Sequence, residues 1–245
     1  IATYEFDTVT NEDPEEWETD FIFSLNAYVE DEDGGSRGNG EAKIKVRRGD
    51  FSLSTESSMR VVKTGSSFDV QVSVEDYKQK PVPGVDVELK SIRQVWGMRE
   101  LHQFPLTTQD GKTDQEGIAH FKVKAEKVGE LMLEGRAKDR RGNRILSTDW
   151  AWIDGPGATE LESEYDSMVV NVDKDSYKIG DTAKALIQAA KPGGSVLVTI
   201  EADRIYRSFV VPMTGRNTIV DIPILDEYAP NVYVAVCRIK NKRLE

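Results

Sequence analysis

Apolar and polar residues alternate along short stretches of this chain, with a period of two. The alternation is clearest in seven segments: 21–29, 68–74, 85–89, 118–123, 130–137, 196–200 and 232–236. Side chains two positions apart on a strand share a face, so such runs indicate β-strands with one buried and one solvated face. No window sustains a helical apolar stripe, and the best candidate, 183–190, is short enough to be a strand. The pattern predicts an all-β fold.

Clusters of turn-forming residues separate these segments. They occur at 33–35, 80–84, 109–111, 141–143, 191–194 and 214–215. Gly, Pro, Asn and Asp favour turns because they supply unusual backbone angles or local hydrogen bonds. Frequent turn signals between short strands are typical of antiparallel β-sandwiches of the immunoglobulin and fibronectin-III kind.

Two weak internal repeats indicate more than one such sandwich. Segment 29–34 recurs at 137–142, and segment 63–65 recurs at 178–180, so both repeats have a period near 110 residues. This period fits tandem domains rather than the shorter units of a solenoid.

The repeats divide the chain into three pieces. We expect residues 1–50 to be the C-terminal part of one domain, 51–155 a complete β-sandwich and 156–245 a further β-sandwich. The segment 154–157 contains two glycines and one proline and has no apolar side chain, so it is expected to be a linker.

Composition excludes several classes of function. The formal net charge of −11 argues against sequence-independent nucleic-acid binding and against a polybasic membrane-binding surface. No run of 18 apolar residues exists that could span a membrane. With Cys237 as the single cysteine, no intrachain disulfide can form, and packing alone must hold each domain.

Candidate catalytic and metal-binding residues are few. His102 and His120 are the only histidines, and no spacing typical of a zinc site surrounds them. The acidic segments 31–35 and 173–175 loosely resemble the start of a calcium loop but lack its regular oxygen ligands, so we expect solvated turns. Cys237 is expected to be a half-buried small side chain. We therefore predict no catalytic, cofactor-binding or metal-binding residue and no cofactor.

Trp150 and Trp152 lie two residues apart at the end of the middle piece and share a strand face. Paired aromatic rings could form a stacking surface for sugars or peptides. Because the linker follows immediately, we favour a role at the contact between two domains or at the edge of a core.

The C-terminal third resembles a known family. Its stretches Tyr-Lys-x-Gly-Asp-Thr-Ala, Thr-Ile-Glu-x-Asp and Ala-Pro-Asn-Val-Tyr-Val lie within residues 175–184, 192–205 and 222–234. In this order and spacing they are similar to the segment of bacterial alpha-2-macroglobulins that leads towards the bait-region domain. Residues 51–155 are compatible with one of the family's macroglobulin-like domains.

The resemblance implies a part in a molecular trap for proteases. In this family a protease cuts an exposed bait segment, the inhibitor rearranges and encloses the protease, and a thioester in a Cys-x-x-Gln motif can capture it covalently. Here Cys237 is followed at the fourth position by Lys240, so no functional residue of the family is carried over.

The expected function is therefore that of a scaffold segment, not an enzyme, in a broad-spectrum endopeptidase inhibitor of the bacterial cell envelope. The implied location is periplasmic or extracellular. The implied partners are proteases, met through the full-length parent, and neighbouring macroglobulin-like domains. Contact with a membrane is implied only through a lipid anchor outside this segment.

Two other functions fit the same sequence. A tandem cell-surface adhesin or stalk could be built from similar sandwiches. A glycan-binding module, or a glycan-active enzyme, could use Trp150 and Trp152 with acidic neighbours. Fold alone does not decide between them.

Overall fold

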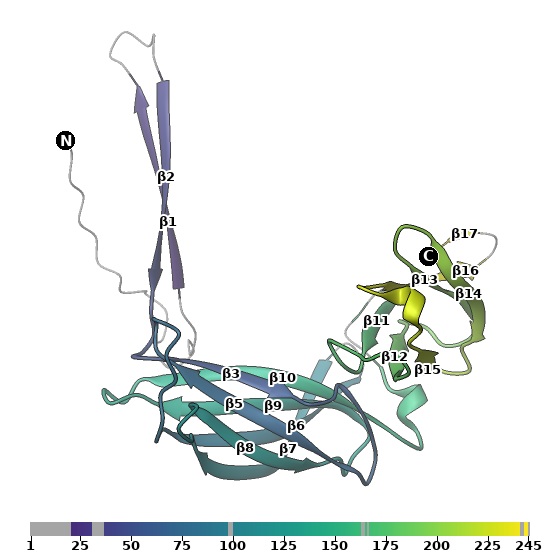
Figure 1. Ribbon diagram of the computed structural model, residues 1–245, viewed down its shortest axis with the longest axis horizontal. Helices are drawn as coiled ribbons and strands as arrows, with labels where there is room; N and C mark the ends of the chain where they lie inside the picture. Colours follow the sequence, from purple (N-terminus) through teal and green to yellow (C-terminus); the bar gives the residue numbers. More distant parts are fainter. Residues whose placement is uncertain are drawn as a thin grey trace.

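The computed structural model describes residues 21–30, 37–97, 100–162, 165, 167–240 and 243–244. Within them, nearly all regular structure is β-strand, and the remainder is two short 3-10 helices. The strands form a long hairpin and two sandwiches that follow one another along the chain (Figure 1). The predicted all-β, antiparallel fold class is confirmed. None of the described helices is both long and apolar enough to cross a membrane.

The hairpin consists of β1 (Phe21–Glu30) and β2 (Arg37–Val46), paired antiparallel along their whole length. It projects from one end of the first sandwich (Figure 1). Several of its large apolar side chains remain exposed, with Ile22 65% and Tyr28 81% accessible. The predicted turn at 33–35 and the acidic segment 31–35 lie outside the described residues, apart from their flanking strands.

The first sandwich packs a three-stranded sheet against a five-stranded sheet. The strand orders are β3-β5-β8 and β4-β10-β9-β6-β7. The strands are β3 (Ser52–Ser57), β4 (Val61–Lys63), β5 (Ser67–Glu75), β6 (Asp86–Gly97), β7 (Glu100–Lys112), β8 (Ile118–Lys124), β9 (Gly129–Lys138) and β10 (Arg144–Asp154). Alternate residues of β5 form the centre of the core: Phe68, Val70, Val72 and Val74, each at most 2% exposed. This is the face that the period-two pattern predicts.

One turn prediction is wrong. Residues 109–111 lie inside β7, paired with β6 through Gln109↔Leu89 and Gly111↔Val87. Gly111 is required by packing and not by a turn, because a Cβ atom there would lie 2.8 Å from the Phe121 ring. A glycine in a strand marks such a close approach as readily as it marks a bend.

The second sandwich has a three-stranded sheet, β11-β12-β15, and a four-stranded sheet, β14-β13-β16-β17. Its strands are β11 (Val169–Val172), β12 (Thr182–Gln188), β13 (Ser195–Glu201), β14 (Ile205–Pro212), β15 (Asn217–Pro223), β16 (Tyr233–Lys240) and β17 (Arg243–Leu244). The 3-10 helix η2 (Asp226–Tyr228) precedes β16. Segment 183–190, the best helical candidate in the sequence, is largely strand β12.

The repeated Lys-x-Gly segments occupy the same kind of turn in the two sandwiches. The Ser66 amide donates to the Lys63 carbonyl at 3.1 Å, and the Asp181 amide donates to the Lys178 carbonyl at 3.0 Å. The intervening glycines have φ values of +87° and +91°, which L-residues with a side chain rarely adopt. This internal repeat is therefore present in the structure as well as in the amino-acid sequence.

Each sandwich has its own apolar core. Residues such as Val72 and Leu133 belong to the first core, and residues such as Ile187 and Val198 belong to the second. A smaller apolar cluster lies where the sandwiches meet. Two separate cores are the arrangement expected of tandem domains.

Candidate functional site

The histidines do not form a chemical site. His102 and His120 are exposed on β7 and β8, and His120 Nε2 lies 3.4 Å from Asp114 Oδ2. His120 therefore lies on the solvated face of its strand, as the alternation predicts. Across the described residues, no group of three His, Cys, Asp or Glu side chains is placed to hold a metal ion. Cys237 is half-buried on β16, opposite Leu197 of β13.

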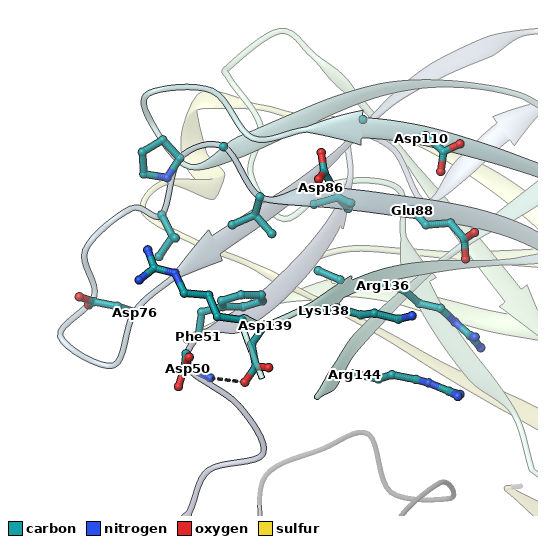
Figure 2. Close-up of a pocket in the computed structure, with 18 residues that line it drawn as sticks. Asp50, Phe51, Asp76, Asp86, Glu88, Asp110, Arg136, Lys138, Asp139 and Arg144 are labelled. Carbon is teal, nitrogen blue, oxygen red and sulfur yellow. Dashed lines mark hydrogen bonds between the residues drawn. The ribbon is translucent and has the colours of Figure 1, made fainter. Parts of the chain in front are cut away.

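A pocket with a volume of about 1180 Å³ lies at the end of the first sandwich nearest the hairpin (Figure 2). Its charged lining residues carry both signs: Asp50, Asp76, Asp86, Glu88, Asp110 and Asp139, with Arg136, Lys138, Arg140 and Arg144. Six carboxylates and four cations leave this lining with a small formal excess of negative charge.

The most buried of these carboxylates, Asp139, has a structural role. It accepts hydrogen bonds from the backbone amides of Arg141 and Asn143 at 2.8 and 2.9 Å. The Asp50 amide and the Asn143 side chain donate to its other oxygen (Figure 2 shows the Asp50 contact). Burial opposes ionisation, but these hydrogen bonds outweigh it and hold the pKa of the Asp139 carboxyl below its ordinary 3.8. Asp139 thus fixes the β9–β10 turn to the chain entering the sandwich.

The prediction that 173–175 is a solvated turn is wrong for Asp173, which is 5% exposed. Its carboxylate accepts hydrogen bonds from the Tyr177 hydroxyl at 2.8 Å and from the Lys184 amide at 2.6 Å. Burial, and then the hydrogen bond to Asp173, raise the pKa of the Tyr177 phenol above its ordinary 10.0. The buried carboxylate is tolerated because these donors replace its water.

The best-built feature outside the two cores is the contact between the sandwiches, which we call the joint. Strand β10 ends at Asp154. Three residues later Gly157, with a φ of +87°, turns the chain into the 3-10 helix η1 (Ala158–Glu160). There Ala158 packs with Trp152 and Val61 of the first sandwich and with Leu186 of the second. All four residues are at most 5% exposed. Of the two positions predicted for the tryptophans, the contact between domains is the one that Trp152 occupies, with Trp150 half-buried beside this cluster.

Hydrogen bonds from the second sandwich hold η1 in place. The Arg216 amide donates to the Thr159 carbonyl at 2.7 Å. The buried Asn217 side chain donates through Nδ2 to the carbonyls of Ala158 at 3.0 Å and Leu161 at 2.8 Å. The segment 154–157, predicted to be a linker, leads directly into this packed segment.

A further backbone contact joins the two sandwiches away from η1. The Arg60 amide donates to the Asp173 carbonyl at 2.8 Å. Two ion pairs lie at the rim, Arg60–Asp175 at 3.0 Å and Arg216–Glu162 at 3.1 Å. Exposed pairs of this kind contribute about 0–1 kcal/mol each, so the apolar cluster and the buried hydrogen bonds dominate.

Gly215 lets the second sandwich approach η1 closely. A Cβ atom at this position would overlap the Thr159 carbonyl oxygen and lie 2.8 Å from Glu160 Oε1. Sequence reasoning identified Gly215 as a turn residue and did not identify Arg60, Arg216 or Asn217 as contact residues. Nothing in their local pattern distinguishes them from ordinary polar residues. The joint has no chemistry of its own, and what it can do is fix the orientation of one sandwich against the other.

Comparison with known proteins identifies a family for the second sandwich. Residues 168–243 match the family model described as the alpha-2-macroglobulin bait region domain. The chain is also 29% identical over 199 residues to a protein named alpha-2-macroglobulin from Ralstonia nicotianae. This match covers 80% of the chain but only 12% of that relative. The predicted family resemblance is confirmed.

Solved structures give weaker similarity. Salmonella alpha-2-macroglobulin reacted with methylamine is 15% identical, covering 92% of this chain and 16% of that one, with a TM-score of 0.41. A tetra-tandem repeat from the extending region of a large adhesion protein is 14% identical, covering 90% and 53%, with a TM-score of 0.32. At these TM-scores neither structure carries an argument about this chain.

Proposed function

On the premise that this chain is a segment of an alpha-2-macroglobulin, we propose that it is a rigid scaffold within a bacterial inhibitor that traps proteases after bait cleavage. It performs no catalysis itself and binds no cofactor. We propose domain boundaries at 1–50, 51–155 and 156–245, and a periplasmic or extracellular location for the parent protein. Proteases are met through the parent, and the neighbouring domains of the same chain are the direct partners.

The observation that carries this proposal is the joint. A stalk of independent domains would need only a flexible linker. Here a buried apolar cluster and the Arg60–Asp173 backbone hydrogen bond connect the sandwiches, and Asn217 holds the connecting segment in place. A trap that closes around a protease must transmit a movement from the cut bait to distant domains. Rigid connections suit that task because a loose one would absorb the movement locally.

The test compares the isolated chain with its full-length parent. Each is mixed with trypsin, and the remaining activity is measured on a large protein substrate and on a small peptide substrate. The parent should block cleavage of the large substrate and leave cleavage of the small substrate unchanged, because small molecules can still reach an enclosed protease. The 245-residue chain should leave both activities unchanged. The proposal would be contradicted by a parent that leaves cleavage of both substrates unchanged, or by an isolated chain that inhibits the protease.

A matched variant tests the scaffold role itself. In the parent, a Gly215→Ala change should leave bait cleavage unchanged but slow the subsequent compaction, measured by small-angle X-ray scattering. The control is Gly40→Ala on β2, where a Cβ atom meets nothing within 4 Å. Equal compaction rates in the two variants would show that the joint transmits nothing.

A further inference from the structure

Positive charges gather at one place on this acidic chain, where the hairpin enters the first sandwich. They lie on the segment that follows β2 and at the turn between β9 and β10. We call this group the basic rim, and its members are Arg47, Arg48, Lys138, Arg140, Arg141 and Arg144. All of them are exposed except Arg48, which is half-buried. Six neighbouring cations in a chain with a net charge of −11 form a surface suited to an anionic partner.

Contacts within the first sandwich hold the two parts of the basic rim together. The Asp50 amide donates to Asp139 Oδ2 at 3.2 Å, and Arg141 Nη2 donates to Asp50 Oδ1 at 2.7 Å. The guanidinium of Arg47 lies 3.9 Å from the centre of the Tyr77 ring, in a cation–π contact. The segment 47–50 is thus fixed against the β9–β10 turn, so the basic rim is a preformed surface.

Part of the basic rim forms one wall of the pocket in Figure 2. Lys138 and Arg144 lie on the opposite side of that pocket from Asp86 and Glu88. Each of these two carboxylates has a lysine of its own at 3.1 Å. Asp139, beside the rim, is buried and accepts hydrogen bonds from backbone amides. The described part of this wall therefore carries more positive than negative charge, although the whole lining of the pocket is slightly acidic.

An acidic segment of the same chain is tethered beside the basic rim. Residues 12–20, which lie outside the described residues, include six Asp or Glu and no Lys or Arg. The next residue, Phe21, is paired with Val46, and Val46 is followed directly by Arg47. Nine extended residues can span about 30 Å. From Arg47, the β9–β10 turn is only three residues and one hydrogen bond away, through Asp50. The acidic segment is therefore long enough to follow the rim.

We propose that the acidic segment 12–20 docks on the basic rim and thereby fixes the piece that carries the hairpin against the first sandwich. One exposed ion pair contributes little, but several pairs acting together contribute more. The tether raises the effective concentration of the segment at the rim. A nucleic acid or an anionic membrane is disfavoured as the occupant, because the net charge of −11 repels both. This inference does not depend on the proposed function.

The test measures whether the acidic segment stays beside the first sandwich. In a Cys237→Ser background, spin labels are placed at Thr10→Cys, just before the segment, and at Lys122→Cys, an exposed position on β8. The distance distribution between the labels is recorded at about 20 mM and about 1 M salt, where the screening length falls to about 3 Å. Docking through charges should give a narrow distribution at low salt and a broad one at high salt.

Reversing charges on the two partners tests whether they pair with each other. Lys138→Glu with Arg140→Glu turns attractions into repulsions, so it should lower the ratio of docked to undocked segment at low salt by about tenfold or more. Adding Glu15→Lys and Glu16→Lys to that variant restores opposite charges and should narrow the distribution again. If the distribution stays broad after this second change, the rim does not act by pairing with the segment and the proposal is overturned.

The matched control is Lys124→Glu with Lys127→Glu, which makes the same change of net charge at the other end of the first sandwich. It should leave the distribution narrow at low salt. A parent distribution that is already broad at low salt overturns the proposal, and so does an equal response to the control and to the change at the rim. The parent should also bind neither a DNA duplex nor phosphatidylserine vesicles. Binding of either that is lost when Lys138 and Arg140 are changed would assign the rim to that partner and overturn the docking of the segment.

Discussion

A single methyl group at Gly215 should loosen the joint without unfolding either sandwich. Gly215 lies in the loop between β14 and β15, where its backbone approaches η1. In a Gly215→Ala variant the new Cβ would lie 2.9 Å from the Thr159 carbonyl carbon, and most of the obstruction is backbone rather than a flexible side chain. The loop and η1 must therefore move apart.

The required displacement is large enough to break a hydrogen bond. Carbon atoms pack at about 3.5–4.0 Å, so the separation must grow by roughly 0.6–1 Å. The Arg216–Thr159 hydrogen bond, 2.7 Å long, would then lie at or beyond the limit for such a bond. Losing it costs about 1 kcal/mol, and overpacking costs about 1–3 kcal/mol. A total of about 2–4 kcal/mol raises the ratio of open to closed joint by roughly 30- to 1000-fold.

The measurement is a distance distribution between spin labels on the two sandwiches. Cys237 is changed to Ser, and labels are placed at Lys122→Cys on β8 and Ser208→Cys on β14, both exposed positions. Gly215→Ala should broaden the distribution, while far-UV circular dichroism stays that of the parent. Gly40→Ala serves as the control. If the two variants give the same narrow distribution, the close approach at Gly215 does not hold the joint.

Two further variants test the buried carboxylates that organise turns. Asp139→Asn cannot accept all the hydrogen bonds that the carboxylate accepts, so the free energy of unfolding at pH 7 should fall by about 1–3 kcal/mol. Because folding lowers the pKa of Asp139, its contribution is present above pH 3.8 and is lost as the pH falls through the lower folded value. Urea unfolding should therefore give a smaller difference between variant and parent at pH 2 than at pH 7, and an equal difference would contradict this account. Tyr177→Phe removes the hydroxyl bound to Asp173, which should cost about 1–2 kcal/mol at pH 8. Since folding raises the pKa of this phenol, its contribution is full below pH 10 and is lost at higher pH, so the variant should lose less stability than the parent between pH 8 and 11. If the free energy of unfolding of the variant falls as steeply between pH 8 and 11 as that of the parent, this role of Tyr177 is contradicted.

The sequence was sufficient to predict strands whose two faces differ. Phe68 and Val70 are buried while Asp69 and Gln71, which follow them, are exposed, and this contrast is what a period-two pattern records. Cross-strand pairing then follows, because inward-facing residues must meet other inward-facing residues. The same reasoning correctly placed His120 on a solvated face and Cys237 at a half-buried position.

Strand β7 was missed because its environment erases the pattern. Most of its 13 residues are exposed, whichever face of the strand they are on, since β7 is the outer strand of the five-stranded sheet. Without a buried face the alternation has no physical cause, and Gln109 to Gly111 then resemble a turn by composition alone. Pairing with β6 decides the conformation, and pairing is not a local property of the sequence.

The joint could be predicted only in part, for a related reason. Trp152 carries a visible signal, because a large aromatic residue beside a linker has few places to pack other than the neighbouring domain. Asn217 carries none, since its two hydrogen bonds go to backbone carbonyls, which every residue has. Such contacts depend on where two segments of the chain meet in space. They put no constraint on the identity of the residue whose carbonyl accepts the hydrogen bond.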